Sequence, residues 1–407
     1  MDSSQAIRST GAFRLATFLR AVAEGFIAIS VPFQAIKLGA GPVQLGILGT
    51  LMSASYSGGC LVFSRFIGRI PRRSSVLSVL VFLSLVGLAI GYAPTLPILY
   101  ALVVVAGLGA SLFWPQVMAW LADQVEGENL TRQFGAFNLA WCSGFPVGMI
   151  IGGNLFEMHM LLPYYGILVV TFMAAAVLWL FTGPAKNGIR LERSKQPPEE
   201  HPDAPTIDIS EPAVGATRAR TFILMSWIAM FATYFVCGNY RYQLPKLAKS
   251  VGIGEGAFGA LMFLLYGSQL AVFFVLMRSE RWHFKRRFLW PAQIVVAVSS
   301  ILIYLSVKPL ALAAAFVLAG IGTGITYFSS QYYGIRYAAG RAQRAAIHEA
   351  LIGAGYLSGA FFGGQLAEVY SLRAPYFGSV LVLLVLLLVQ IALEKRRHPR
   401  QATPVRT

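Results

Sequence analysis

Two charged residues, Arg20 and Glu24, stand in the interior of a mainly apolar stretch from residue 13 to residue 38. A spacing of four residues places both side chains on one face of a helix, and Glu24 would lie about 15 Å along a helix that starts at Phe13. Burial disfavours a charged carboxylate and a nearby arginine favours it, so a change in either can load or release a proton. The pair predicts a proton or cation switch. The alternative is a static ion pair that holds this helix to its neighbours.

His348 and Glu349 form a second ionisable pair, at the start of the apolar stretch from 348 to 370. They lie near the expected membrane interface, where water reaches them, so Glu349 ranks after Glu24 as a coupling candidate. The pair does not continue into the His-Glu-x-x-His pattern of zinc proteases.

The sequence contains no pattern that predicts catalysis. Cys60, Cys142 and Cys237 lie far apart and match no metal or redox spacing. A phosphate-binding P-loop is absent, and the glycine patterns do not follow a strand as a dinucleotide site requires. We therefore expect no enzyme activity, no metal and no cofactor.

Composition indicates that the charged pairs lie in a membrane protein. Apolar residues make up 56% of the chain and charged residues 12%, whereas soluble domains hold about 25% charged residues. Twelve apolar stretches approach the roughly 20 residues that span a hydrocarbon core. They lie near residues 13–38, 43–66, 75–93, 97–122, 134–156, 163–183, 220–247, 256–278, 288–306, 309–334, 348–370 and 374–394. Because lipid offers no partner to backbone polar groups, we expect all of them to be helices.

The chain is an internal duplication. The segment from 38 to 73 recurs 213 positions downstream, with Gly46 returning as Gly259; further on the offset is 211, and Gly148 returns as Gly359. Two copies in the same direction, with six apolar stretches each, predict an all-α membrane protein built from two parallel six-helix repeats. A proline-rich segment with few large apolar residues predicts a disordered linker between them. The expected units are a six-helix bundle at 1–183, the linker at 184–218, a second bundle at 219–397 and a tail at 398–407.

The positions of the lysines and arginines predict the orientation. An even number of spans puts both termini on one side, and of the 33 lysines and arginines, 26 fall on that side, six on the other and Arg20 within a span. The six are Lys37, Arg241, Lys246, Lys249, Lys308 and Arg373. Since cytoplasmic loops are rich in these residues, we expect cytoplasmic termini and a cytoplasmic linker. The net charge of +16 then reflects topology, and no nucleic-acid partner is expected because no such motif is present.

Twelve helices in two parallel repeats, a basic loop after the second helix that recurs after the eighth, and a long middle loop together resemble the major facilitator superfamily. The family's first basic loop reads Gly-x-Leu-x-Asp-Arg-x-Gly-Arg-Arg, and the matching segment here is SRFIGRIPRR at 64–73, with Gly68 at the acidic position. The resemblance implies a gating loop that contains Arg65, Arg69, Arg72 and Arg73. The same arginines could equally serve topology alone.

Two glycine-rich segments, GFPVGMIIGG at 144–153 and GYLSGAFFGG at 355–364, lie in the fifth and eleventh stretches. The first resembles the glycine-rich helix of the family's drug-exporting antiporters. Small residues every four positions also let two helix backbones approach closely, whatever the substrate. The pattern predicts close helix packing and favours export only slightly.

The resemblance also implies a substrate cavity between the repeats, near the middle of the membrane. Polar and aromatic residues at that depth join Arg20, Glu24 and Glu349 as candidate substrate or coupling residues. They are Tyr56, Trp114, Gln116, Asn138, Trp141, Tyr234, Asn239, Tyr266, Gln269, Tyr327, Gln331 and Tyr356. Each could equally pack between helices. A set that is mainly aromatic and amide predicts a modest-sized, partly apolar or amphipathic solute.

These expectations combine into a secondary active transporter of the inner or plasma membrane that moves a small molecule by alternating access. Coupling to protons or another ion, a monomeric state in the lipid bilayer, and export as one direction of transport belong to the same hypothesis. The alternative is a non-transporting receptor or assembly factor on the same scaffold.

Overall fold

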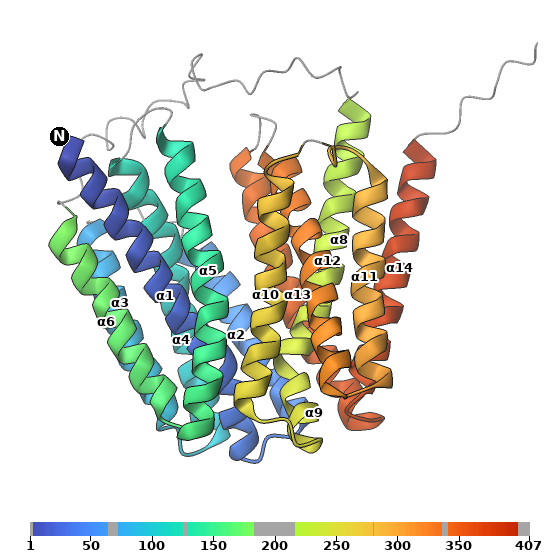
Figure 1. Ribbon diagram of the computed structural model, residues 1–407, viewed down its shortest axis with the longest axis horizontal. Helices are drawn as coiled ribbons and strands as arrows, with labels where there is room; N and C mark the ends of the chain where they lie inside the picture. Colours follow the sequence, from blue (N-terminus) through green and yellow to red (C-terminus); the bar gives the residue numbers. More distant parts are fainter. Residues whose placement is uncertain are drawn as a thin grey trace, which may run out of the picture.

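The computed structural model describes residues 3–63, 72–124, 129–182, 216–279, 281–335 and 341–397, and these residues form thirteen helices. The first half holds α1 (Ser3–Lys37), α2 (Pro42–Phe63), α3 (Arg72–Gly91), α4 (Leu96–Gln124), α5 (Asn129–Met158) and α6 (Leu162–Phe181). The second half holds α8 (Ala216–Tyr242), α9 (Leu244–Ser250), α10 (Glu255–Leu276), α11 (Arg286–Leu305), α12 (Pro309–Ile335), α13 (Arg341–Val369) and α14 (Ala374–Arg397). The helices of each half run side by side, as Figure 1 shows.

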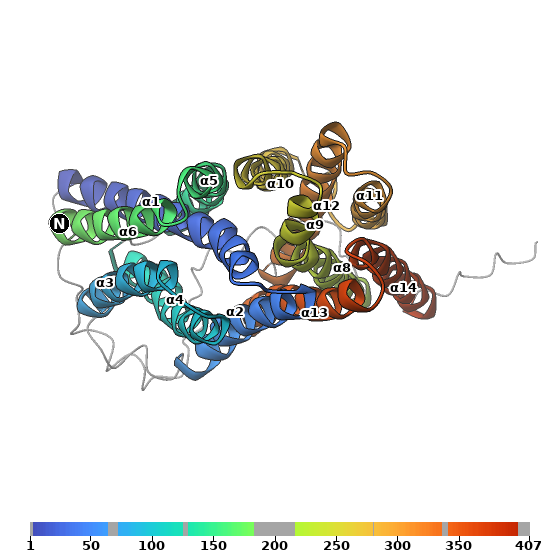
Figure 2. The ribbon, with the colours of Figure 1, turned by 90° about the horizontal axis from the view of Figure 1, so that it is seen from below.

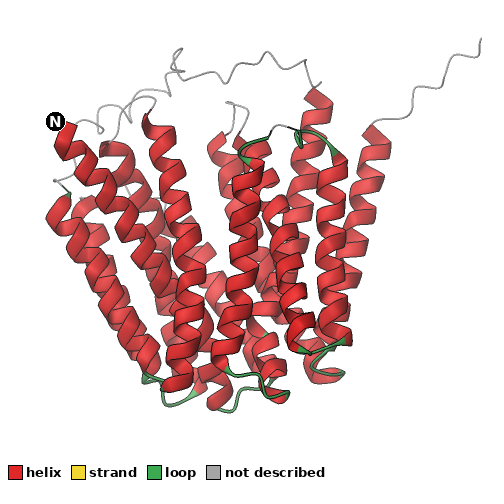
Figure 3. Cartoon of the chain, viewed as in Figure 1, coloured by secondary structure: helices red, strands yellow, loops and turns green. Residues whose placement is uncertain are grey.

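Both halves present their chain ends on one face, which we call the tail face. There α1 begins, α6 ends, α8 begins and α14 ends, at the top of Figure 1. On the other face, which we call the closed face, α1 ends and α10 begins. Short loops join most helices there (Figure 3).

Eleven of the helices are long and apolar enough to cross a membrane. α13 is equally long but less apolar, because its middle carries five glycines and its start is charged. Together with α13, the eleven form twelve long helices, six in each half, which confirms the predicted fold class.

One predicted span, 220–247, is divided in the structure into α8 and the short helix α9. Pro245 lies at the start of α9, where the missing N–H of proline is tolerated. α8 ends just before it, at Tyr242. Beyond α9 the chain turns into α10 through Gly252, whose φ of +80° favours glycine. Gly39, its counterpart at the 213 offset, has a φ of +87°, so the duplication extends to this turn.

The glycines of α5 and α13 pack against the first long helix of their own half. A Cβ on Gly148 would lie 2.2 Å from the backbone oxygen of Val22 in α1, and a Cβ on Gly359 would lie 1.9 Å from that of Phe235 in α8. Neither space admits a side chain. The two copies therefore use the same glycine positions for the same helix pair, α1 with α5 and α8 with α13.

The two halves meet at two crossings that are also made by glycine. Gly46 of α2 faces Gly364 of α13, and Gly259 of α10 faces Gly153 of α5, each with an ideal Cβ 3.3 Å from the other residue's Cα. Gly46 and Gly259 are equivalent at the 213 offset, and Gly153 and Gly364 at the 211 offset. Figure 2 shows α2 against α13, and α5 beside α10. We call these contacts the glycine crossings.

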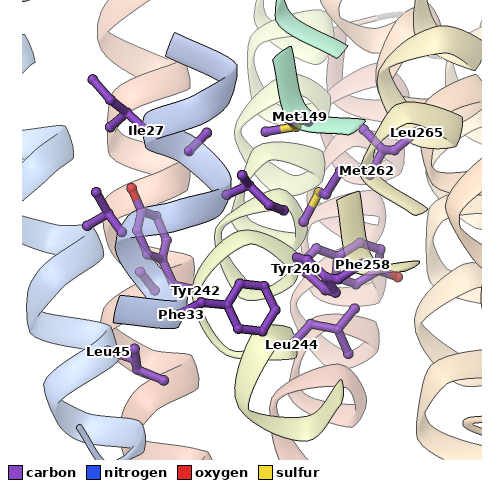
Figure 4. Packing of buried hydrophobic residues seen from close by; sticks show 14 of the residues in the cluster. Ile27, Phe33, Leu45, Met149, Tyr240, Tyr242, Leu244, Phe258, Met262 and Leu265 are labelled. Atoms are coloured by element: carbon purple, nitrogen blue, oxygen red, sulfur yellow. The ribbon is translucent and has the colours of Figure 1, made fainter. Parts of the chain in front are cut away.

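Apolar and polar contacts accompany the crossings near the closed face. Phe33 of α1 meets Phe258 of α10 edge to face, with ring centroids 5.4 Å apart (Figure 4). Lys246 Nζ donates a hydrogen bond to the backbone oxygen of Ala40 at 2.6 Å. Gly256 N donates one to Glu157 Oε2 at 2.9 Å. Nearer the tail face α5 and α10 diverge (Figure 1).

The crossings predict the effect of a side chain at Gly153. In Gly153→Val the Cβ would lie 2.5 Å from the backbone oxygen of Glu255, so the halves must shift apart. We expect a destabilisation of about 1–3 kcal/mol, as for other overpacked sites, measured as a lower unfolding temperature of the purified protein. Gly58→Val in α2 is the matched control because no atom lies within 4 Å of its Cβ. Equal unfolding temperatures for the two variants would contradict the packing role.

Candidate functional site

Arg20 and Glu24 form an ion pair on α1, as their spacing predicts. Arg20 Nη2 lies 3.3 Å from Glu24 Oε1, and the indole Nε1 of Trp114 in α4 donates a hydrogen bond to the same carboxylate oxygen at 2.9 Å. The arginine is buried, at 2% exposed, while the carboxylate is 20% exposed. Arg20 also lies over the ring of Phe113, 5.8 Å from its centroid. The carboxylate is thus oriented by two donors and remains accessible to a ligand or a proton.

A row of aromatic rings leads from this carboxylate across to the second half. Trp114 contacts Trp141 of α5 with centroids 6.5 Å apart, and Trp141 stacks on Phe145 at 6.0 Å. Phe145 then meets Tyr266 of α10 edge to face at 4.9 Å. Trp114 and Trp141 are therefore linked to Tyr266 of the second half through Phe145, which the sequence did not single out.

Four tyrosines of the candidate set gather in the second half. The hydroxyl groups of Tyr266 and Tyr356 lie 2.9 Å apart and share a hydrogen bond. The ring of Tyr356 contacts Tyr234 at 5.2 Å, and Tyr234 contacts Tyr327 at 6.2 Å. Gln269 is buried and lines a small pocket with Trp141 and Tyr266. This surface is aromatic with a few hydroxyl and amide groups, which suits a partly apolar solute.

The second ionisable pair lies deeper along its helix than predicted. α13 begins at Arg341, so Glu349 lies about 12 Å from the helix start at 1.5 Å per residue. His348 is 3% exposed and shares a hydrogen bond of 2.9 Å between its Nδ1 and Ser330 Oγ. Glu349 is exposed, and Tyr56 of α2 is partly buried.

Other candidates do not join this cluster. Asn239 Nδ2 donates to Ser379 Oγ at 2.9 Å, which fixes α8 to α14. Gln116 is 3% exposed, and its Oε1 accepts no hydrogen bond within the described part of the chain. Asn138 is exposed and Gln331 is partly buried. Of these four, only Asn239 has an assigned structural contact.

The predicted gating loop falls largely outside the described residues. Arg65 and Arg69 lie there, and Arg72 begins α3 but its side chain is among the parts not described. Arg73 Nη2 donates to the backbone oxygen of Trp179 at 2.7 Å. This contact joins α3 to α6 within the first half, so it does not link the two halves.

Arg241 is a functional candidate that the sequence did not single out. It lies in the last turn of α8, toward the closed face, and is partly buried. Its guanidinium carbon lies 5.8 Å from the ring centroids of Phe145 and Tyr356 and 5.6 Å from that of Tyr242. It also lines a small pocket with residues of α1, α2 and α4. A signal in the sequence was its position two residues after Asn239, a predicted site residue of the same helix.

Sequence comparison gives two results. A family model described as Major Facilitator Superfamily matches residues 14–240 and 226–407. The chain is also 27% identical over 114 residues to "Multidrug resistance protein 1" of Bacillus subtilis (strain 168), which is 28% of this chain and 29% of that relative.

Solved transporters share the fold at low sequence identity. A bacterial homolog of the human lysosomal transporter Spinster, in an inward-facing and unoccupied conformation, gives a TM-score of 0.73 at 14% identity and covers 100% of both chains. A point mutant of the nucleoside transporter NupG gives 0.69 at 12%, over 95% of this chain and 99% of its own. A point mutant of the peptide transporter POT gives 0.73 at 15%, over 95% and 94%. With the family model matching both halves, the chain belongs to the major facilitator superfamily.

Proposed function

We propose that the protein is a secondary active transporter that moves a small amphipathic solute by alternating access of its two halves. The observation that carries the proposal is the asymmetry of the contacts between the halves. Near the closed face they meet through the glycine crossings, while Glu349, farther toward the tail face, is exposed. A family member with this arrangement can rock about the crossings. It would then expose its central surface, by which we mean the aromatic row from Trp114 to Tyr266 and the four tyrosines beside it, to each side in turn.

Glu24 is the group that we propose for proton coupling. It is a carboxylate within a membrane span. Such groups are energetically costly there, so they usually mark a functional site. Arg20 and Trp114 hold its carboxylate, and solute binding or movement of α4 relative to α1 would change these contacts. In this proposal, proton exchange at Glu24 accompanies that change.

Orientation and direction complete the proposal. The distribution of lysines and arginines supports cytoplasmic termini, with residues 184–218 as a linker and the protein in the inner or plasma membrane as a monomer. The tail face would then be cytoplasmic and the structure open to the inside. Export is supported by the short similarity to the relative named "Multidrug resistance protein 1".

Flux from a panel of solutes in proteoliposomes, with and without an imposed pH gradient, tests both transport and coupling. We expect the pH gradient to drive accumulation of at least one solute. Glu24→Gln keeps size and hydrogen bonding but cannot titrate, so it should abolish pH-driven accumulation and leave counterflow in part intact. If Glu24→Gln accumulates solute like the parent protein, the pair is structural, and Glu349 becomes the coupling candidate.

Arg20→Ala should behave differently from Glu24→Gln. It leaves the carboxylate in the span without its partner, which costs about 3–5 kcal/mol at a fully buried pair and less here because Glu24 is 20% exposed. We expect a lower unfolding temperature together with lost transport. A stable, inactive Arg20→Ala protein would show instead that the arginine acts only in transport.

A disulfide across the closed face tests alternating access directly. A Cβ on Gly256 of α10 would lie 3.3 Å from Asn154 Cγ of α5, whose place Sγ takes in Asn154→Cys, so the two cysteines are within reach of a disulfide. In Asn154→Cys with Gly256→Cys, oxidation should cross-link the halves and stop flux, and a reductant should restore it. The control is Gly87→Cys with Ile167→Cys within the first half, where the Cβ atoms would lie 3.5 Å apart. Undiminished flux through the cross-linked closed face would contradict rocking of the halves.

Labelling of introduced cysteines tests the orientation. Thr95 lies just before α4 on the closed face, and Ser210 lies in the linker, outside the described residues. In intact cells a membrane-impermeant maleimide should label a cysteine at Thr95 and should reach one at Ser210 only after lysis. The parent protein, with its own three cysteines, sets the background. Labelling of Ser210 from outside would reverse the orientation.

A further inference from the structure

Arg241 carries a permanent positive charge and forms no ion pair with another described residue. Its Nε is buried without an acceptor, and among the described residues Arg241 has no ion pair or hydrogen bond. Arginine has five N–H donors in the plane of its guanidinium group and cannot shed its proton in a protein. The side chain is partly buried, so its charge is incompletely hydrated and an anion bound to it would be stabilised.

The aromatic rings around Arg241 do not replace an anionic partner. Phe145, Tyr242 and Tyr356 attract the cation through their faces, but a ring face does not accept the in-plane N–H groups as a carboxylate does. The carboxylate of Glu24 is held by Arg20 and Trp114 instead.

The surroundings of Arg241 are apolar on two sides. One small pocket lies between Arg241 and Ile27, Val31 and Leu48, with Tyr242 beside Ile27 as Figure 4 shows. A second pocket is lined by Trp141, Phe145 and Tyr266, and Phe145 is one of the rings under the guanidinium group. A ligand that fits both features has an anionic head and an apolar or aromatic body.

We infer that Arg241 binds the carboxylate of the transported solute, and that the substrates are monocarboxylates with an apolar or aromatic body. This inference rests on the proposed transport function, whereas its test measures ligand binding alone. Arg241 lies beside both halves, since Phe145 belongs to α5 and Tyr356 to α13. A carboxylate bound there would therefore be sensed by both halves as they move.

The test is ligand binding to the purified protein in nanodiscs, followed by tryptophan fluorescence and by the unfolding temperature. The probes are matched sets of one skeleton, such as 1-naphthylacetate, 1-naphthylacetamide and 2-(1-naphthyl)ethylamine, with octanoate and octanamide as an aliphatic pair. We expect at least one carboxylate to bind ten-fold or more tightly than its amide and amine. Arg241→Gln should erase that preference, and Arg241→Lys, which keeps the charge but loses the planar donors, should retain part of it.

Two controls separate a binding site from a structural contact. Arg278→Gln removes another arginine that lies over a ring, at 5.9 Å from Phe274, and should leave the preference for the acid unchanged. Arg241→Gln without ligand should unfold at the same temperature as the parent protein or higher, because it removes an unpaired charge. A clear loss of stability in Arg241→Gln, with equal weakening of acids and amides, would assign Arg241 a structural role and overturn the proposal.

Three further outcomes would also overturn it. They are an acid preference that persists in Arg241→Gln, equal binding of acid and amide by the parent protein, and stabilisation by chloride as large as that by the acids. Absence of binding by every acid in the panel counts against the proposal in the same way. If acids bind as expected but no solute is transported in proteoliposomes, the binding site stands and the proposed transport function fails.

Discussion

The close approach of glycine backbones is the constraint on which the rest of the structure depends. Inside each half, glycines of α5 and α13 let these helices lie directly against α1 and α8. Between the halves, Gly153 with Gly259 and Gly46 with Gly364 bring α5 against α10 and α13 against α2. Because α5 and α13 carry both contacts, the position of one half relative to the other follows from these two helices. The aromatic row from Trp114 to Tyr266 exists only because α5 and α10 are held this close.

The chemistry of the site departs from this symmetry. The counterparts of Arg20 and Glu24 in the second repeat, at the 213 offset, are Thr233 and Cys237. The counterpart of Arg241 in the first repeat is Ala28, which lines the pocket beside the arginine itself. The two repeats therefore share a symmetric backbone frame but carry their charged residues at different positions along it. The first half presents a paired carboxylate and the second an arginine without an ion pair among the described residues, so the two halves differ in charge although their backbones correspond.

Much of this arrangement could be predicted from the sequence because its causes are local or periodic. The apolar stretches predict the long helices, the repeat predicts the two halves, and the spacing of Arg20 and Glu24 predicts their ion pair. Partners across the structure could not be predicted in the same way. The pattern of α5 predicts that some helix packs closely, but not that Gly152 contacts α1 while Gly153 contacts α10. Arg241 was not singled out because a charge near the end of an apolar stretch is compatible both with the membrane interface and with a ligand site, and its contacts with Phe145 and Tyr356 appear only in the structure.

The smooth surface of the glycine crossings has a kinetic consequence. Side chains that interlock must change rotamers together before two helices can separate, whereas backbones in contact through glycine have no rotamers to change. Separation of the closed face then requires the loss of the Phe33–Phe258 ring contact and of a few hydrogen bonds, which include Lys246 to Ala40, Gln243 to Pro42 and Gly256 to Glu157. We therefore expect a low activation barrier for opening, set by these few contacts. The turnover rate should then be limited by solute binding and release rather than by separation of the helices.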